Sequence, residues 1–277
     1  MKQVNHVPEK SYGILQQTVA GSAIDRVVEQ VRRLGYGILE SGYGADELQN
    51  LSAEFDSVHG KYLESHGEAW LTGIDEHNTI RAPLTHGSAA FLKLAFNENL
   101  LLALKKLIAG KFILNQQNGI INPPQQTYNQ SAWHRDLPYQ HFLSSTPLAI
   151  NALFCLDDFT FENGATFVLP ASHKSEVFPS EPYVKKNALQ IEAKAGSFIL
   201  LDCMLFHAGG FNGTQARRRA INHVYNIPYF KQQINLPANM SDAELSPEQS
   251  EILGFRYLEP VSVAAYLSGR GSQKANY

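Results

Sequence analysis

The chain has 277 residues, of which 44% are hydrophobic and 18% charged, a composition that can bury one sizeable core. The net charge is −3 and the basic residues form only short, dispersed clusters, so nothing indicates binding to nucleic acid or to an anionic membrane surface. Residues 1–17 contain no secretory signal, and the longest apolar stretches are too short to span a membrane. We therefore expect a cytoplasmic protein whose two cysteines, Cys155 and Cys203, are buried and reduced.

The N-terminal part of the chain, about residues 20–110, is predicted to be helical. Apolar residues recur at helical spacing over residues 24–33, and again from Ala45 to about Tyr62. Between these two helices, Gly35 ends the first and residues 36–39 have the pattern of a short strand.

Residues 64–87 are polar, rich in glycine, histidine and threonine, and lack periodicity. We predict a long loop here that acts as a mobile lid over the functional site; the alternative is an ordered surface excursion with no role. Within it, Arg81 is either a partner for an anionic substrate or an ordinary surface arginine. A third helix is predicted over residues 88–109, and Asn97-Glu98-Asn99 is a candidate break in it.

After Gly110 the pattern changes to short strands separated by turn signals. The predicted strands are 112–114, 119–121, 148–156, 165–169, 189–191, 197–201 and 219–227. Helices followed by many short strands predict an α+β fold in which the strands close as two facing sheets of a jelly roll. This core covers about residues 111–230, and a tail of about 231–277 is polar and then partly helical around residues 246–253. No linker interrupts the pattern, so we expect a single domain over residues 1–277.

The triplet His134-Arg135-Asp136 is the first chemical signal. In an extended segment, residues two apart project to the same side, so the histidine and the aspartate can reach one metal ion while Arg135 points away. The triplet alone is weak evidence in a chain with ten histidines. Its flanks strengthen it, because Trp133 and the run 137–139 (Leu-Pro-Tyr) can shield a metal from bulk water.

A second signal is His207, which ends the apolar run 197–206; that run has the pattern of a buried strand. Two imidazoles and one carboxylate are the ligand set of a facial Fe(II) site, which leaves coordination positions open for a chelating cosubstrate and oxygen. An arginine beyond the second histidine could bind the distal carboxylate of a 2-oxo acid. Three candidates follow in a row, Arg217, Arg218 and Arg219, and only one parity of this strand can face the interior.

An ordered series of motifs closely resembles the phytanoyl-CoA dioxygenase family. The motifs are the segments 133–137 (WHRDL), 156–158 (LDD), 162–166 (ENGAT), 170–174 (PASHK), 196–197 (GS), 207–210 (HAGG) and 218–221 (RRAI). The resemblance extends, less specifically, over most of the chain. It implies a double-stranded β-helix, a bound Fe(II) ion, 2-oxoglutarate as cosubstrate, and O2 as oxidant. Members of the family typically hydroxylate small molecules and release succinate and CO2.

The resemblance also assigns residues. It implies that His134, Asp136 and His207 are the metal ligands, and that Arg218, eleven residues after His207, binds 2-oxoglutarate. Asn151 matches a position where a polar side chain often faces the cosubstrate; the alternative is an asparagine satisfied within the sheet. The chain departs from the family at Gly209, where a hydroxyl residue is common, so one hydrogen bond to the cosubstrate is missing or replaced. It departs also at Ala171, where glycine is usual and only the turn is affected.

Other polar residues near these motifs have weaker assignments. We interpret His173 as a structural turn residue. Tyr139 and His141 either face the substrate or occupy exposed or core positions. In the strand that begins near Arg218, Asn222 shares its inward parity and His223 does not.

The sequence thus predicts an Fe(II)/2-oxoglutarate-dependent dioxygenase that hydroxylates a small-molecule metabolite. Desaturation, epoxidation and ring formation would use the same residues and stay open as alternatives. Halogenation is disfavoured, because it needs a halide in place of the carboxylate of Asp136. A catalytically silent jelly-roll binding protein is the alternative from another class. No concentrated basic patch suits the phosphates of an acyl-CoA, and the sequence fixes neither the substrate nor the oligomeric state.

Overall fold

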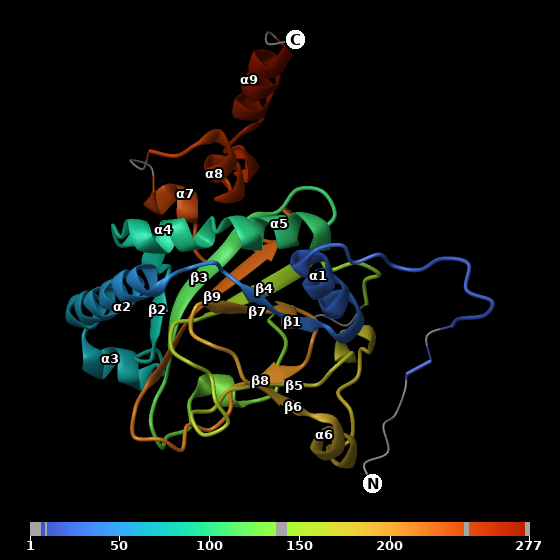
Figure 1. The fold of residues 1–277 in the computed structure, drawn as a ribbon. Coiled ribbons are helices and arrows are strands. Elements are labelled where there is room, and N and C mark those ends of the chain that lie inside the picture. Colours follow the sequence, from blue (N-terminus) through green and yellow to red (C-terminus); the bar gives the residue numbers. More distant parts are fainter. Residues whose placement is uncertain (1–6, 9, 137–142, 241–243, 275–277) are drawn as a thin grey trace.

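The computed structural model describes residues 7, 8, 10–136, 143–240 and 244–274, and it has an α+β architecture (Figure 1). The larger antiparallel sheet has the strand order β1-β7-β4-β9-β3-β2, and the smaller has the order β6-β5-β8. The strands span Tyr36–Glu40 (β1), Thr79–Arg81 (β2), Ile113–Asn122 (β3), Ala149–Cys155 (β4), Thr166–Val168 (β5), Leu189–Ile191 (β6), Ser197–Asp202 (β7), His207–Ala208 (β8) and Arg218–Asn226 (β9).

Helices cover the face of the large sheet that points away from the small sheet (Figure 1). The α-helices span Ala23–Leu34 (α1), Ala45–His66 (α2), Glu68–Gly73 (α3), Ala89–Ala95 (α4), Glu98–Leu107 (α5), Glu181–Asn187 (α6), Leu236–Asn239 (α7), Pro247–Ile252 (α8) and Val263–Lys274 (α9). Short 3-10 helices span Pro83–Thr85 (η1), Asn129–Ser131 (η2), Ser172–Lys174 (η3) and Phe255–Tyr257 (η4). Among the described segments, every helix is too short or too polar to cross a membrane.

Strand β4 shows how the two faces of the large sheet differ. It is buried along its whole length, and its side chains alternate between two separate cores. Ala152 and Phe154 pack with the helices, whereas Leu153 and Cys155 pack between the two sheets. Cys155 and Cys203 are both free and buried, as the sequence predicts. The space between the sheets is therefore lined by one parity of each central strand.

The predicted helices are largely confirmed. Helix α1 begins at Ser22, whose side chain accepts a hydrogen bond from the Asp25 backbone N–H, and ends at Gly35 in the left-handed conformation (φ 86°). The predicted third helix is indeed broken at Asn97, which caps α5 by accepting from the Leu100 backbone N–H. The tail helix predicted near residues 246–253 is α8.

The prediction of a long loop over residues 64–87 is wrong. Helix α2 extends to His66, helix α3 follows it, and β2 adds an edge strand to the large sheet by pairing with β3. A three-residue strand and a six-residue helix are too short to produce a periodic signal.

Strand β3 is continuous where the sequence predicts two strands, because its middle is the polar run 115–118. Gln117 is fully buried there: its Oε1 accepts from the Leu84 N–H (2.9 Å), and its Nε2 donates to the Phe91 carbonyl (2.9 Å). Gly119 lies against α2, since a Cβ at this position would come within 2.8 Å of Phe55 Cε2. The middle of this central strand is therefore buried although it is polar, because the Gln117 amide is hydrogen-bonded and Gly119 allows α2 to approach closely.

Candidate metal centre

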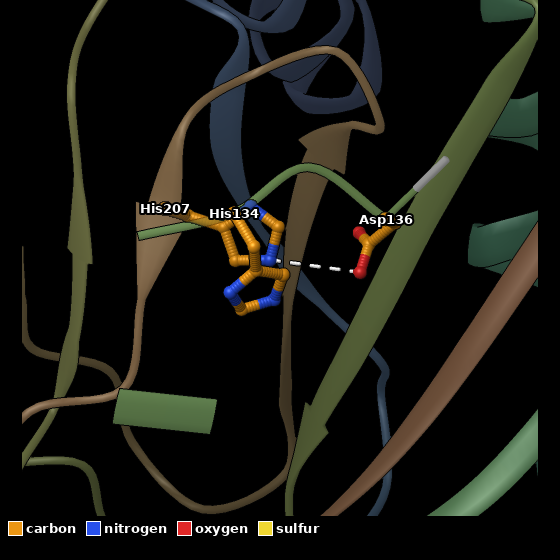
Figure 2. Close-up of side chains that lie close together, drawn as sticks. All are labelled: His134, Asp136 and His207. Atoms are coloured by element: carbon orange, nitrogen blue, oxygen red, sulfur yellow. Dashed lines mark ion pairs between the residues drawn. The ribbon is translucent and has the colours of Figure 1, made fainter. Parts of the chain in front are cut away.

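His134 and His207 are held side by side by a pair of backbone hydrogen bonds. The His134 N–H donates to the His207 carbonyl (2.9 Å), and the His207 N–H donates to the His134 carbonyl (3.1 Å). Directly paired residues of antiparallel chains project their side chains to the same face, and the two imidazole centroids are 4.3 Å apart (Figure 2). The segment before Asp136 therefore lies alongside β8, the edge strand of the small sheet.

The prediction that His207 ends one long buried strand is wrong. Strand β7 stops at Asp202, a turn covers residues 203–206, and His207 begins β8 in the other sheet. Arg135, which points away from the histidines as predicted, stabilises this turn. Its guanidinium donates to the carbonyls of Met204 (2.7 Å) and Ser172 (3.2 Å) and stacks on the Phe206 ring at 3.9 Å.

Asp136 completes a cluster with the two histidines, as the same-side spacing predicts. One ligand atom from each of the three residues lies within 4.8 Å of the others, and His207 Nε2 is 3.6 Å from Asp136 Oδ1 (Figure 2). The Asp136 N–H donates to the Cys203 carbonyl (3.2 Å), which fixes the backbone of this segment against the turn. Two imidazole nitrogens and one carboxylate oxygen converging at this spacing can ligate a single metal ion.

Both imidazoles are oriented by carbonyl groups two residues earlier in the chain. His134 Nδ1 lies 2.7 Å from the Ala132 carbonyl, and His207 Nδ1 lies 3.0 Å from the Leu205 carbonyl. Because a carbonyl only accepts, each Nδ1 carries a proton, and in the neutral imidazole Nε2 then presents a lone pair. These carbonyls are the outer partners that orient metal-binding histidines, and the sequence did not identify them.

The electrostatics of the cluster favour a carboxylate flanked by imidazoles. Burial lowers the pKa of His134, and the neighbouring His207 adds to this effect. Burial also opposes the charged form of His207, but the Asp136 carboxylate outweighs it and the pKa of His207 is raised. Burial disfavours ionised Asp136, yet the two histidines and the Asn151 amide outweigh it, so the pKa of Asp136 is lowered. Asp136 is thus held in the deprotonated form that binds metals.

Asn151, in the middle of the inner face of β4, contacts the cluster directly. Its Nδ2 donates to Asp136 Oδ2 (2.8 Å), which turns the other carboxylate oxygen toward His207. Its Oδ1 is buried without a hydrogen-bond partner. The asparagine is therefore anchored on one side and offers an unused acceptor on the other.

Arg218 is 3% exposed and belongs to the inner face of β9. Its guanidinium stacks on the Phe159 ring at 3.9 Å, donates to the Gly164 carbonyl, and lies 3.4 Å from the Tyr128 hydroxyl through Nη2. Its Nε has no partner, and no carboxylate of the described residues forms an ion pair with it. Burial lowers the pKa of Arg218. A buried cation without an ion-pair partner is costly, so this position favours binding of an anion.

The two flanking arginines point elsewhere, as the strand parity predicts. Arg217 pairs with Asp56 at 2.7 Å on the exposed surface. Arg219 pairs with Asp157 (2.8 Å) and with Asp56 (3.0 Å) on the helix side of the sheet. Of the three arginines, only Arg218 thus points to the interior, and the other two form ion pairs with aspartates outside it.

A cavity between the sheets brings these groups together. Its lining consists of Ile120, Tyr128, Gln130, His134, Asp136, Asn151, Leu153, Thr166, Leu201, His207, Gly209, Arg218, Ala220 and Asn222. The five residues that the family resemblance assigns to metal or cosubstrate binding (His134, Asp136, Asn151, His207 and Arg218) all lie in this lining. No residue of 64–87 does, so the structure gives no support to a lid formed by that segment.

Tyr128, Gln130 and Thr166 are lining residues that the sequence analysis missed. Tyr128 and Gln130 lie in an irregular segment without a periodic signal. The glycine at position 209, where the family commonly has a hydroxyl residue, was the one sequence feature that pointed to a replacement.

The remaining candidates that the structure describes have structural roles. His173 is buried in η3, outside the cavity lining, with its Nε2 3.3 Å from the Arg32 carbonyl, which supports its interpretation as a turn residue. His223 faces the helix side, between Gln117 and the Ala152 carbonyl. Arg81 pairs with Glu76, which supports the surface-arginine alternative. The segment 137–142, with Tyr139 and His141, lies outside the described residues.

Comparisons with known proteins show which family model and which relatives this chain matches. The family model described as "Phytanoyl-CoA dioxygenase (PhyH)" matches residues 31–220. The uncharacterised protein Rv1501 of Mycobacterium tuberculosis is 28% identical over 267 residues, which cover 90% of this chain and 97% of the relative. The iron/alpha-ketoglutarate-dependent dioxygenase ausO of Aspergillus calidoustus is 23% identical over 256 residues, covering 83% of this chain and 82% of the relative.

A solved structure with the same fold is the epimerase SnoN in complex with Fe3+, alpha ketoglutarate and nogalamycin RO. It superposes with a TM-score of 0.58 at 18% identity, covering 81% of this chain and 93% of SnoN. The likeness identifies the two facing sheets as the 2-oxoglutarate oxygenase fold, a double-stranded β-helix. The predicted fold class is therefore confirmed.

Proposed function

Because the chain belongs to the phytanoyl-CoA dioxygenase family of Fe(II)/2-oxoglutarate-dependent enzymes, we propose that His134, Asp136 and His207 bind its Fe(II) ion. The observation that carries this proposal is the convergence of their ligand atoms within 4.8 Å. Both Nδ1 atoms already have carbonyl partners, so the two Nε2 lone pairs are free for a metal. The donor set and its orientation fit Fe(II).

The bound metal with 2-oxoglutarate and O2 supplies the oxidising chemistry, with succinate and CO2 as coproducts. The residues of this chain bind, orient and exclude water around that chemistry. Asn151 keeps Asp136 turned toward the histidines through the 2.8 Å hydrogen bond, and the residue belongs to the lining of the same cavity. We assign Asn151 to orienting the metal ligand through one N–H of Nδ2 and, through the second N–H of the same amide, to donating to the cosubstrate.

Arg218 is proposed to bind the distal carboxylate of 2-oxoglutarate. It is a buried cation with an unpartnered Nε, and it shares the cavity with the three proposed ligands. The stacked Phe159 ring fixes the plane of the guanidinium, so its orientation is set before a ligand binds. A planar guanidinium and a carboxylate match through paired charge-assisted hydrogen bonds.

The proposed reaction is hydroxylation of a small-molecule metabolite. Desaturation, epoxidation and ring formation would rely on the same residues, and SnoN, which shares the fold, is an epimerase. The reaction type is decided by where the substrate lies relative to the metal. We propose that residues 1–277 act as one dioxygenase domain, since the cavity draws on β3, β4, β7, β8 and β9 together.

We propose further that the substrate is polar rather than a long acyl chain. Asn222 lines the cavity, Asn118 lies opposite it in the β3–β9 register, and Gln116 Nε2 is 3.4 Å from Asn222 Oδ1. An amide donates and accepts at once, which suits hydroxyl-bearing molecules, whereas an acyl chain favours an apolar wall. A metabolite screen coupled to succinate release should find hits among polar, hydroxyl-bearing compounds; turnover of acyl-CoA alone would contradict this.

The function is tested by metal-dependent turnover of 2-oxoglutarate. Purified protein should bind one Fe(II) per chain and convert 2-oxoglutarate to succinate in the presence of O2 and a substrate. Asp136→Ala should abolish both, while Asp158→Ala, which changes an aspartate outside the cavity, should leave both intact. Full metal binding and turnover in Asp136→Ala would refute the assignment, and a folded wild type without turnover would favour the silent binding protein.

A further inference from the structure

We propose that the Tyr128 hydroxyl is a second donor to the distal carboxylate of 2-oxoglutarate, beside Arg218. Glycine at position 209 leaves the space that the Tyr128 phenol occupies. This inference rests on the function proposed above. It assigns to Tyr128 a positioning role that the sequence motifs do not show.

The first observation is the fit of Tyr128 against Gly209. A Cβ placed on Gly209 would lie 2.2 Å from the Tyr128 hydroxyl oxygen and 2.9 Å from its Cζ. No side chain is compatible with this approach, so glycine is required here for space. The Gly209 N–H also donates to the Gln130 carbonyl (2.7 Å), which holds the two segments together. The phenol thus occupies the volume that a side chain at position 209 would fill.

Tyr128 and Arg218 contact each other, and each keeps a hydrogen-bond donor without an acceptor among the described residues. Arg218 Nη2 lies 3.4 Å from the Tyr128 oxygen, so the hydroxyl can accept from the guanidinium. The proton of the hydroxyl has no acceptor among the described residues, and Arg218 Nε is likewise unused. Burial raises the pKa of Tyr128, so the hydroxyl stays protonated. Both groups line the same cavity, and each has a donor left for an incoming anion.

These donors suit one carboxylate with two oxygens. A guanidinium supplies charge and a planar pair of N–H groups, while a phenol supplies one directed O–H. Because the ring is partly buried and packed against Gly209, the hydroxyl is positioned before the ligand arrives. Tyr128 therefore acts on cosubstrate binding, and it should affect only ligands that carry the distal carboxylate.

The test compares two 2-oxo acids on Mn(II)-loaded protein by titration calorimetry. 2-Oxoglutarate has the distal carboxylate, and 2-oxobutyrate has the same 2-oxo acid head without it. Tyr128→Phe should weaken 2-oxoglutarate binding by roughly tenfold or more, the loss expected for one hydrogen bond to a charged group. Binding of 2-oxobutyrate should change by less than about twofold. Equal losses for both ligands, or no loss for 2-oxoglutarate, would overturn the inference.

A pair of variants tests the role of Gly209. Gly209→Ala should displace the phenol and weaken 2-oxoglutarate binding selectively. Tyr128→Ala removes the ring, and Tyr128→Ala combined with Gly209→Ser should recover part of the lost affinity by supplying a hydroxyl from position 209. Affinity in the double variant no better than in Tyr128→Ala would count against a hydroxyl subsite at this place.

The wild-type result separates this inference from the proposed function. If wild-type protein binds neither 2-oxo acid in a metal-dependent manner, the proposed function fails and this inference fails with it. If wild type prefers 2-oxoglutarate and Tyr128→Phe keeps the full preference, only the role of Tyr128 is refuted.

Discussion

Replacing Arg218 by lysine is the sharpest test of the cosubstrate site. Lysine keeps the positive charge but loses the planar fork, the stacking on Phe159 and the fixed direction of the donors. The variant should therefore still attract an anion while losing at least one directed hydrogen bond to it.

The size of the effect follows from the burial of the site. Arg218 is 3% exposed, so water screens its interactions little. A hydrogen bond to a charged group contributes about 1.5–3 kcal/mol, which corresponds to a roughly 10- to 150-fold increase in the Kd for 2-oxoglutarate. The matched control is Arg217→Lys, because the Arg217 side chain is 44% exposed and pairs with Asp56 outside the cavity. It should change the Kd by less than about threefold.

The assay is titration calorimetry of Mn(II)-loaded protein with 2-oxoglutarate, combined with thermal unfolding to confirm that each variant is folded. A large Kd change in Arg217→Lys, with Arg218→Lys near wild type, would show that the β9 register is wrong by one residue. If both variants bind like wild type, the carboxylate does not bind at this arginine run.

Three further predictions concern stability and metal affinity. Burial lowers the pKa of His223 from 6.5 to about 4, so its neutral form contributes stability that is fully present above pH 6.5 and is lost as the pH falls toward 4. Urea unfolding over this range should show the free energy of unfolding fall by about 3 kcal/mol, and His223→Asn should lack this pH dependence. Ala171 has φ 62°, so Ala171→Gly should stabilise by up to about 1 kcal/mol, whereas Ala188→Gly at φ −64° should destabilise; the opposite order in Tm would contradict the strain. Asn151→Ala frees Asp136 and should weaken Mn(II) binding roughly 10- to 100-fold, and unchanged affinity would exclude the orienting role.

The sequence by itself determined the elements that have strong periodicity and the residues that carry the chemistry. Helix α1 and the break at Asn97 follow from local spacing and capping, which act within a few residues. The side chains of an extended chain alternate between its two faces. This alternation alone predicted that His134 and Asp136 lie on the same side, and that Arg218 points away from Arg217 and Arg219.

Only the tertiary structure decided how distant segments meet. The turn after β7 that carries His207 into the small sheet depends on the contacts of Arg135 with carbonyls far along the chain. The approach of Tyr128 to Gly209 joins residues more than eighty positions apart, and no local pattern encodes it. A polar residue such as Gln117 gives a strand the sequence pattern of a loop, and only its hydrogen-bond partners in the fold show that the amide is buried. Local preference acts over a turn or a strand, whereas a site in a sandwich is assembled by packing between sheets, which the linear sequence does not display.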